Sequence, residues 1–145
     1  LHKAIRRQRQ MCIRDSSYLW ERKITLIVPV PLHPRRKRKR GFNQAEIVAK
    51  VLSENTGIAM DAGAVKRIKA TSPQKELGDK GRKRNIRGAF AVQKNIKGEN
   101  IVLIDDIYTT GSTLDETARV LKKAGAENVY FLTVSIGQGI CYLLY

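Results

Sequence analysis

The hydrophobic positions of this chain follow two periods, one typical of buried strands and one typical of helices. Continuous apolar runs at residues 24–30, 101–104 and 129–134 predict strands that are covered on both faces, as in a parallel sheet. Residues 64–68 and 90–93 predict two shorter strands. Because helical patterns separate these strands, the sequence predicts an α/β fold with an open, mostly parallel sheet flanked by helices.

Two segments have apolar residues at intervals of three and four, which predicts two amphipathic helices. We expect Asn43 to cap the first helix and Gly57 to end it. We expect the second helix to begin near Ser112 or Thr113 and to end at Gly125. The positions expected to face the core are Ala45, Val48, Ala49, Leu52, Leu114, Ala118, Leu121 and Ala124.

Two long polar stretches show neither the strand period nor the helix period, and we expect them to be loops. The first, residues 31–41, carries the basic run 35–40 between Pro34 and Gly41. The second, residues 70–88, is rich in Lys and Arg and is interrupted by glycine and proline.

The ends of the chain show no useful periodicity. We therefore expect one domain over residues 24–139, a basic N-terminal segment of unassigned structure at 1–23, and a tail at 140–145.

The charge balance indicates an anionic partner. The 145 residues include 28 Lys and Arg against 13 Asp and Glu, a formal net charge of +15. Cys12 and Cys141 lack the spacing of a disulfide framework or a zinc site, which fits a reducing cytoplasm. No apolar stretch approaches the roughly 20 residues of a membrane helix.

Residues 101–114, IVLIDDIYTTGSTL, carry the most informative chemistry. The small residues at 109–113 stand before a helix, where backbone N–H groups can converge on a phosphate. Asp105 and Asp106 would repel that anion, so they should face sugar hydroxyls or hydrated Mg²⁺ on the same ligand. A sugar phosphate satisfies both demands, and the chain has neither a Walker A motif nor GxGxxG.

These residues resemble the phosphoribosyl-pyrophosphate (PRPP) motif of type I phosphoribosyltransferases. The surrounding chain resembles the ComF (competence protein F) branch, because VPVPLHP, RGFNQAE, Thr71-x-x-Gln74 and RxxNIRGAF occur in the family's order before the PRPP motif. The similarity spans about residues 27–137. It implies a type I phosphoribosyltransferase fold, PRPP as ligand and Mg²⁺ as cofactor.

The resemblance also implies roles for particular residues. Asp105 and Asp106 would be the catalytic pair, contacting the ribose 2- and 3-hydroxyls and, through ribose or water, the metal ion. Pro31 and Leu32 fall where the family's pyrophosphate loop follows its first core strand. The residues expected to wrap the 5-phosphate are Tyr108, Thr109, Thr110, Gly111, Ser112 and Thr113.

Two basic segments are candidates for further phosphate contacts. In the second loop, Arg82 and Arg87 are the candidates for closing over pyrophosphate, because guanidinium groups match phosphate oxygens well. The run at 35–40 fits a solvated loop, pyrophosphate contact or nucleic-acid contact equally well. Phe42 is the one aromatic residue beside it that could stack on bases. His33 is expected to be structural rather than catalytic.

The chain departs from the ComF pattern at its ends. ComF-like proteins commonly carry a four-cysteine zinc ribbon at the N-terminus, whereas Cys12 alone precedes this core. Residues 10–17 and 140–145 match nothing in the family. We expect these two ends to reflect truncation or misassembly of the recorded sequence.

The resemblance favours an enzyme that transfers a phosphoribosyl group to a nucleobase-type acceptor and releases pyrophosphate. Two other functions stay open: a non-enzymatic accessory in DNA uptake that binds single-stranded DNA through its basic surface, and a regulator that senses PRPP without turnover. Related phosphoribosyltransferases are frequently dimers, so a homodimer is a further expectation.

Overall fold

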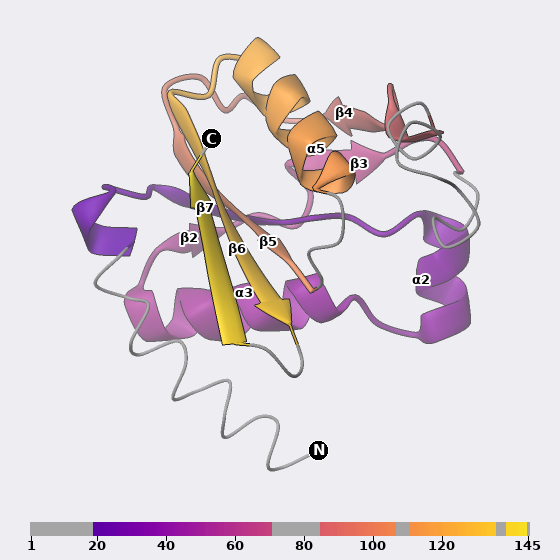
Figure 1. Ribbon diagram of the computed structural model, residues 1–145, viewed down its shortest axis with the longest axis horizontal. Helices are drawn as coiled ribbons and strands as arrows, with labels where there is room; N and C mark the ends of the chain where they lie inside the picture. Colours follow the sequence, from indigo (N-terminus) through magenta and orange to yellow (C-terminus); the bar gives the residue numbers. More distant parts are fainter. Residues whose placement is uncertain (1–18, 71–84, 107–110, 136–138, 145) are drawn as a thin grey trace.

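The computed structural model of the chain describes residues 19–70, 85–106, 111–135 and 139–144. Its centre is a five-stranded sheet in the order β2-β1-β5-β6-β7 (Figure 1). The first four strands in that order run parallel, and β7 pairs antiparallel with β6. The mostly parallel α/β architecture is therefore confirmed. The strands are β1 (Leu26–Pro29), β2 (Ala59–Met60), β5 (Asn100–Asp105), β6 (Asn128–Ser135) and β7 (Gly139–Leu144).

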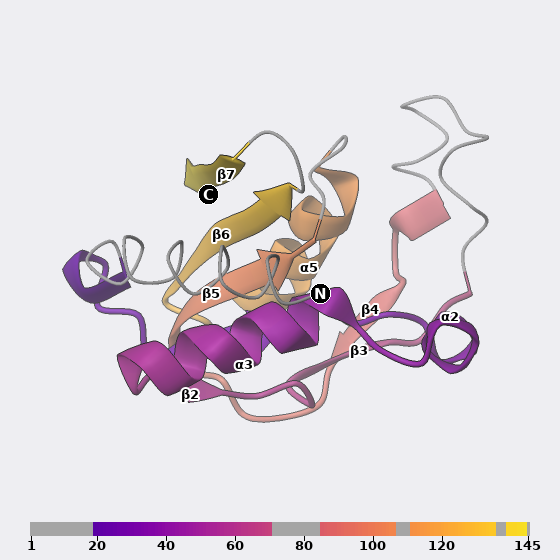
Figure 2. The ribbon, with the colours of Figure 1, turned by 90° about the horizontal axis from the view of Figure 1, so that it is seen from below.

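Two helices cover opposite faces of this sheet. Helix α3 (Gln44–Thr56) packs on β1 and β5, and helix α5 (Ser112–Lys123) packs on β5 and β6 from the other side (Figure 2). Successive side chains of β5 point to opposite faces of the sheet, so a helix is needed on each face to bury them. Ile101 and Leu103 join the core under α5, whereas the residues between and after them join the core under α3.

A small antiparallel sheet extends the α5 side of the molecule. It consists of β3 (Val65–Arg67) and β4 (Phe90–Val92), which confirms the two short strands expected from the sequence. Val65 and Phe90 are buried in the same core cluster as the inward side of α5. The small sheet thereby fixes one wall of the region beyond the carboxyl end of β5.

The ends of the two large helices agree only in part with the sequence. Asn43 caps α3 by accepting the Ala45 N–H, and Gly57 ends it at φ 73°, both as expected. Helix α5 begins at Ser112, as expected, and its N-cap is Gly111. Ala124 is exposed rather than inward, because α5 ends at Lys123 and the chain has already left the core.

The basic run is not a loop, as the polar pattern predicts, but helix α2 (Pro34–Arg40). Three local features favour the helix. His33 Nδ1 accepts the Arg35 N–H, Pro34 occupies the first helical turn, and Gly41 ends the helix at φ 81°. Periodicity could not reveal this helix because none of its residues is buried. Figure 2 shows α2 standing apart from the large sheet.

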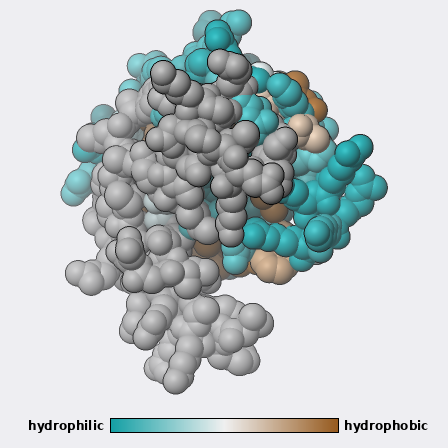
Figure 3. Space-filling view, turned by 45° about the vertical axis from the view of Figure 1, so that its right-hand side comes forward, coloured by the Kyte–Doolittle hydropathy of each residue, from teal (hydrophilic) through white to brown (hydrophobic). Residues whose placement is uncertain are grey.

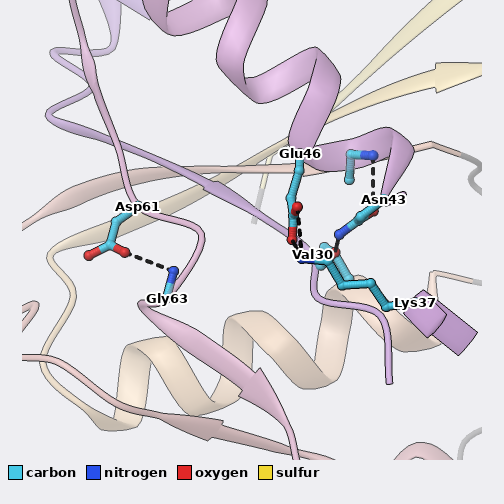
Figure 4. Close-up of polar contacts among 7 residues, drawn as sticks. Val30, Lys37, Asn43, Glu46, Asp61 and Gly63 are labelled. Atoms are coloured by element: carbon cyan, nitrogen blue, oxygen red, sulfur yellow. Dashed lines mark hydrogen bonds and ion pairs between the residues drawn. The ribbon is translucent and has the colours of Figure 1, made fainter. Parts of the chain in front are cut away.

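Helix α2 is attached to α3 by polar contacts rather than by a core. The Lys37 ammonium lies 2.8 Å from Glu46 Oε1 on the first turn of α3 (Figure 4). Asn43, buried between the two helices, donates its amide to the Val30 carbonyl at 3.0 Å. Asn43 therefore ties the start of α3 to the chain leaving β1.

Two strands lie outside the elements expected from the sequence. Strand β2 has two residues, and β7 occupies positions for which the sequence pattern suggests only a tail. In the described ranges of the chain, no helix is long and apolar enough to cross a membrane.

Candidate functional site

The acid pair lies where the carboxyl ends of two neighbouring strands meet. Asp105 ends β5 and Asp106 follows it, and both side chains are half-buried. The Val30 N–H donates to the Ile104 carbonyl at 2.8 Å, which holds the end of β1 beside the end of β5. Pro31 and Leu32 follow Val30 directly, so the fold brings the expected pyrophosphate segment to the acid pair. In open α/β sheets this edge is where ligands bind.

The electrostatics of the pair favour a cation or hydroxyl donors. Burial, reinforced by the negative charge of Asp106, raises the pKa of Asp105 to about 7, and the charge of Arg67 acts in the opposite direction. The Asp106 N–H donates to Asp105 Oδ1 at 2.9 Å. Near neutral pH the charge of the pair would therefore be stabilised by hydrogen bonds from sugar hydroxyls or by a divalent cation.

Helix α5 begins six residues after Asp106. Gly111, its N-cap, is at φ 72° and makes no side-chain capping bond. A side chain at this position would be strained, because only glycine adopts this conformation readily. Ser112 is buried in the first turn, and the positive end of the helix dipole faces the site. The other expected phosphate contacts, Tyr108, Thr109 and Thr110, lie outside the described residues.

Arg67 is a site residue that sequence reasoning missed. It is only 8 % exposed, and its guanidinium lies 5.6 Å from the centre of the Phe90 ring. Burial and, to a smaller extent, the charge of Arg36 lower the pKa of Arg67 to about 10, and the charge of Asp105 opposes both effects. Arg67 thus links the acid pair electrostatically to α2. The available signal was strand alternation, which puts Val65 and Arg67 on the same inward face of β3.

Helix α2 forms another wall of the site. A cavity of about 380 Å³ is lined by Leu32 together with Arg36, Lys39 and Arg40. Arg40 Nη1 lies 3.8 Å from Asp106 Oδ2, a long and solvent-exposed ion pair. The sequence left the basic run without a location, whereas the fold places it against both the expected pyrophosphate segment and the acid pair.

Of the two candidate arginines in the second basic segment, Arg87 lies in the described part of the chain. Arg82 lies outside the described residues. Arg87 is exposed, and the neighbouring Gly88 donates its N–H to the buried Glu116 carboxylate at 2.8 Å. Arg119, which chelates the same carboxylate, lowers the pKa of Glu116, and Arg87 contributes to this shift. Arg87 is therefore near enough to Glu116 of α5 for the two charges to interact.

The acid pair also decides whether Mg²⁺ fits. Mg²⁺ prefers oxygen ligands and is commonly held by one or two carboxylates together with substrate phosphates. Among the residues that the structure describes, no three His, Cys, Asp or Glu side chains gather into a metal site. Asp105 and Asp106 supply the hard oxygen donors that suit a metal ion arriving with a phosphorylated ligand.

Comparison with known proteins identifies this arrangement. The family described as "Phosphoribosyl transferase domain" matches residues 11–139. The chain belongs to the phosphoribosyltransferase family. Among its relatives are the DNA utilization protein YhgH of Salmonella typhi, 41% identical over 71% of this chain and 45% of that protein, and competence protein F of Haemophilus influenzae, 38% identical over 82% and 54%. This chain thus spans about half the length of these relatives.

The solved structures agree on the fold. The chain is similar in structure to the purine phosphoribosyltransferase from Pyrococcus horikoshii, with a TM-score of 0.55 and 20% identity over 86% of this chain and 68% of that one. The resemblance to type I phosphoribosyltransferases and to competence protein F is therefore confirmed for family and fold.

Proposed function

We propose that this domain binds PRPP with Mg²⁺ and transfers its phosphoribosyl group to an acceptor, releasing pyrophosphate. One observation carries the proposal: an acid pair ends β5, the Gly111-capped helix follows it, and the end of β1 lies alongside. PRPP carries hydroxyl groups between its 5-phosphate and its pyrophosphate. These groups match the acid pair, the N-terminus of α5 and the cations of α2.

Each part of the site has a separate task in this proposal. Asp105 and Asp106 accept hydrogen bonds from the ribose 2- and 3-hydroxyls. The first turn of α5, with the preceding segment from Tyr108 to Thr110, holds the 5-phosphate. Pro31 and Leu32 meet the pyrophosphate. Its charge is offset by Arg36, Lys39 and Arg40 of α2 and by Arg67.

The reaction follows from what these groups stabilise. The bond between C1 and the pyrophosphate oxygen breaks, pyrophosphate leaves with the electron pair, and C1 becomes oxocarbenium-like. The acceptor then forms a bond to C1 and loses a proton. Bound Mg²⁺ would neutralise charge on the departing pyrophosphate. The half-buried carboxylates near the ribose favour the positive charge that develops on the ring.

Calorimetric titration with PRPP and Mg²⁺ tests the binding step. We expect saturable binding that is lost in the double variant Asp105→Asn/Asp106→Asn. Glu54→Gln, which removes an exposed carboxylate from α3, is the matched control and should bind as the unaltered protein does. Lack of PRPP binding by the unaltered protein would refute the proposal.

A panel of purine and pyrimidine acceptors tests the transfer step. Pyrophosphate release that depends on one acceptor would establish the enzyme and name its substrate. PRPP binding without release for any acceptor would instead favour a regulator that senses PRPP.

A second candidate function is binding of single-stranded DNA. Its specific support is α2, whose six cationic residues are all exposed, and the names of relatives described as DNA utilization and competence proteins. Phe42 follows α2 and is 47% exposed, which offers one ring for base stacking. We expect a labelled oligonucleotide to bind with strong salt dependence, and Asp105→Asn/Asp106→Asn to leave that binding intact. Binding that does not weaken with salt would contradict this function.

A further inference from the structure

The cations of helix α2 are concentrated on one side of the helix. Successive residues of a helix are turned by about 100°, so Arg35, Arg36, Lys39 and Arg40 fall within an arc of about 140°. We call these four residues the α2 cationic face. Lys37, outside this arc, is engaged by Glu46 at 2.8 Å. Arg38 is the remaining cation of the helix and lies on the side opposite Arg36 and Arg40.

The α2 cationic face borders the candidate PRPP site. Three of its members, Arg36, Lys39 and Arg40, line the cavity of about 380 Å³ together with Leu32. Arg40 reaches to within 3.8 Å of Asp106, and Arg36 is near enough to Arg67 to lower its pKa. Figure 3 turns this side of the molecule forward, and most of the residues that it colours there are hydrophilic. The cationic surface and the ligand site therefore share one wall.

A polyanion attracted to α2 must settle where its positive charge is densest. That place is the mouth of the cavity, because the opposite side of the helix offers only Arg38 once Lys37 is paired. A phosphate group inside the cavity would use the same cations from within. It would also repel a phosphodiester chain lying across the mouth.

We propose that helix α2 is a shared anion-binding surface on which single-stranded nucleic acid and the pyrophosphate end of PRPP exclude one another. The inference rests on both functions proposed above. The nucleic acid lies across the α2 cationic face, and pyrophosphate reaches its inner members Arg36, Lys39 and Arg40. When PRPP is bound, its pyrophosphate neutralises the positive charge of α2 that would otherwise bind the nucleic acid.

Displacement of a labelled oligonucleotide tests the exclusion. A fluorescent oligo-dT is bound to the protein, and its anisotropy is followed during titration with PRPP, inorganic pyrophosphate or ribose 5-phosphate, each with Mg²⁺ at constant ionic strength. We expect PRPP and pyrophosphate to release the oligonucleotide and ribose 5-phosphate to leave it bound, because ribose 5-phosphate lacks the group that reaches α2. Without competitor, four phosphate contacts predict a slope of about −3 in log K against log salt.

A pair of variants separates the shared face from general charge. Lys39→Gln should weaken both oligonucleotide and pyrophosphate by about three- to tenfold, as expected for loss of one charge-assisted phosphate contact. Arg38→Gln removes the same charge from the other side of α2 and should change either affinity by less than about twofold. Circular dichroism of both variants checks that the fold is retained.

The possible results distinguish the inference from the functions on which it rests. A ternary complex, with the oligonucleotide still bound at a PRPP concentration that calorimetry shows to be saturating, overturns the exclusion and leaves PRPP binding in place. Equal effects of Lys39→Gln and Arg38→Gln overturn the shared face. Failure of PRPP to bind at all refutes the proposed enzyme, and failure of the oligonucleotide to bind refutes the nucleic-acid function, and either result removes this inference with it.

Discussion

Helices α5 and α2 both follow a strand of the parallel sheet at its carboxyl end, but they are held by different interactions. Helix α5 buries Leu114, Ala118 and Leu121 against the sheet, whereas α2 buries no residue. Helix α2 is stabilised by its N-cap, its C-cap and one ion pair to α3. A packed helix positions a ligand rigidly, and a solvated helix keeps its charges available. The candidate site therefore combines one helix that is packed into the core with a second, cationic helix that is held only at the surface.

The largest contrast between the two helices is expected in core stability. Leu114→Ala should lower the free energy of unfolding by about 2–5 kcal/mol, because Leu114 is 1% exposed and its removal leaves a cavity. Arg38→Ala on α2 should change it by less than about 0.5 kcal/mol. Urea denaturation of both variants provides the measurement. Similar losses for the two would mean that α2 is part of the cooperative core.

The junction between α2 and α3 should show an intermediate effect. Asn43→Ala removes the α3 cap and the buried bond to the Val30 carbonyl, so we expect a loss of about 1–3 kcal/mol. Asn55→Ala, which removes an exposed side-chain bond to the Val51 carbonyl within α3, serves as control and should cost less than about 0.5 kcal/mol. If the two variants unfold at the same urea concentration, Asn43 does not tie the start of α3 to the chain leaving β1.

The acid pair between the two helices should make stability depend on pH. The pKa of Asp105 rises from 3.8 to about 7 on folding, so the folded state holds a proton that the unfolded chain has already lost. This contribution therefore destabilises the folded state progressively as pH rises from about 4 to 7. Asp105→Asn should flatten the decline and be more stable than the unaltered protein at pH 8. Parallel pH profiles from urea denaturation would contradict the raised pKa.

The smallest global effect is expected from the cap of α2. His33→Ala removes the side chain that accepts the Arg35 N–H, and like charges four residues apart already oppose this helix. We expect a change in unfolding free energy below about 0.5 kcal/mol but faster hydrogen exchange of the α2 amides. Exchange measured by NMR should show no such change in α5. Unchanged exchange in α2 would mean that it is held by more than its caps.

The sequence predicts those parts of the fold that bury apolar surface. The runs of β1, β5 and β6 and the stripe of α3 are visible because burial selects the residue at each position. Helix α2 has no buried side, so its amphipathic period is missing and only His33, Pro34 and Gly41 signal it. Strand β2 is too short to leave a pattern.

The residues of the candidate site that lie in one contiguous motif could be predicted from the sequence. Those that come from separate elements and meet only in the folded chain could not. Asp105, Asp106 and Gly111 stand together in one motif, so their shared location needs only one strand and one helix. Arg67 comes from a separate small sheet, and its approach to Asp105 depends on packing of that sheet against α5. Arg40 likewise meets Asp106 only because β1 and β5 are neighbours.

The position of β5 at the centre of the sheet has a consequence for how the chain folds. Strand β1 pairs along its whole length only with β5, and the contact between Thr25 and Asn100 spans 75 residues. Its earlier partner, β2, matches just two positions. During synthesis Ile27 and Val28 can therefore become buried only after most of the domain has left the ribosome. We expect this interval to be the period of greatest exposure to aggregation and to chaperones.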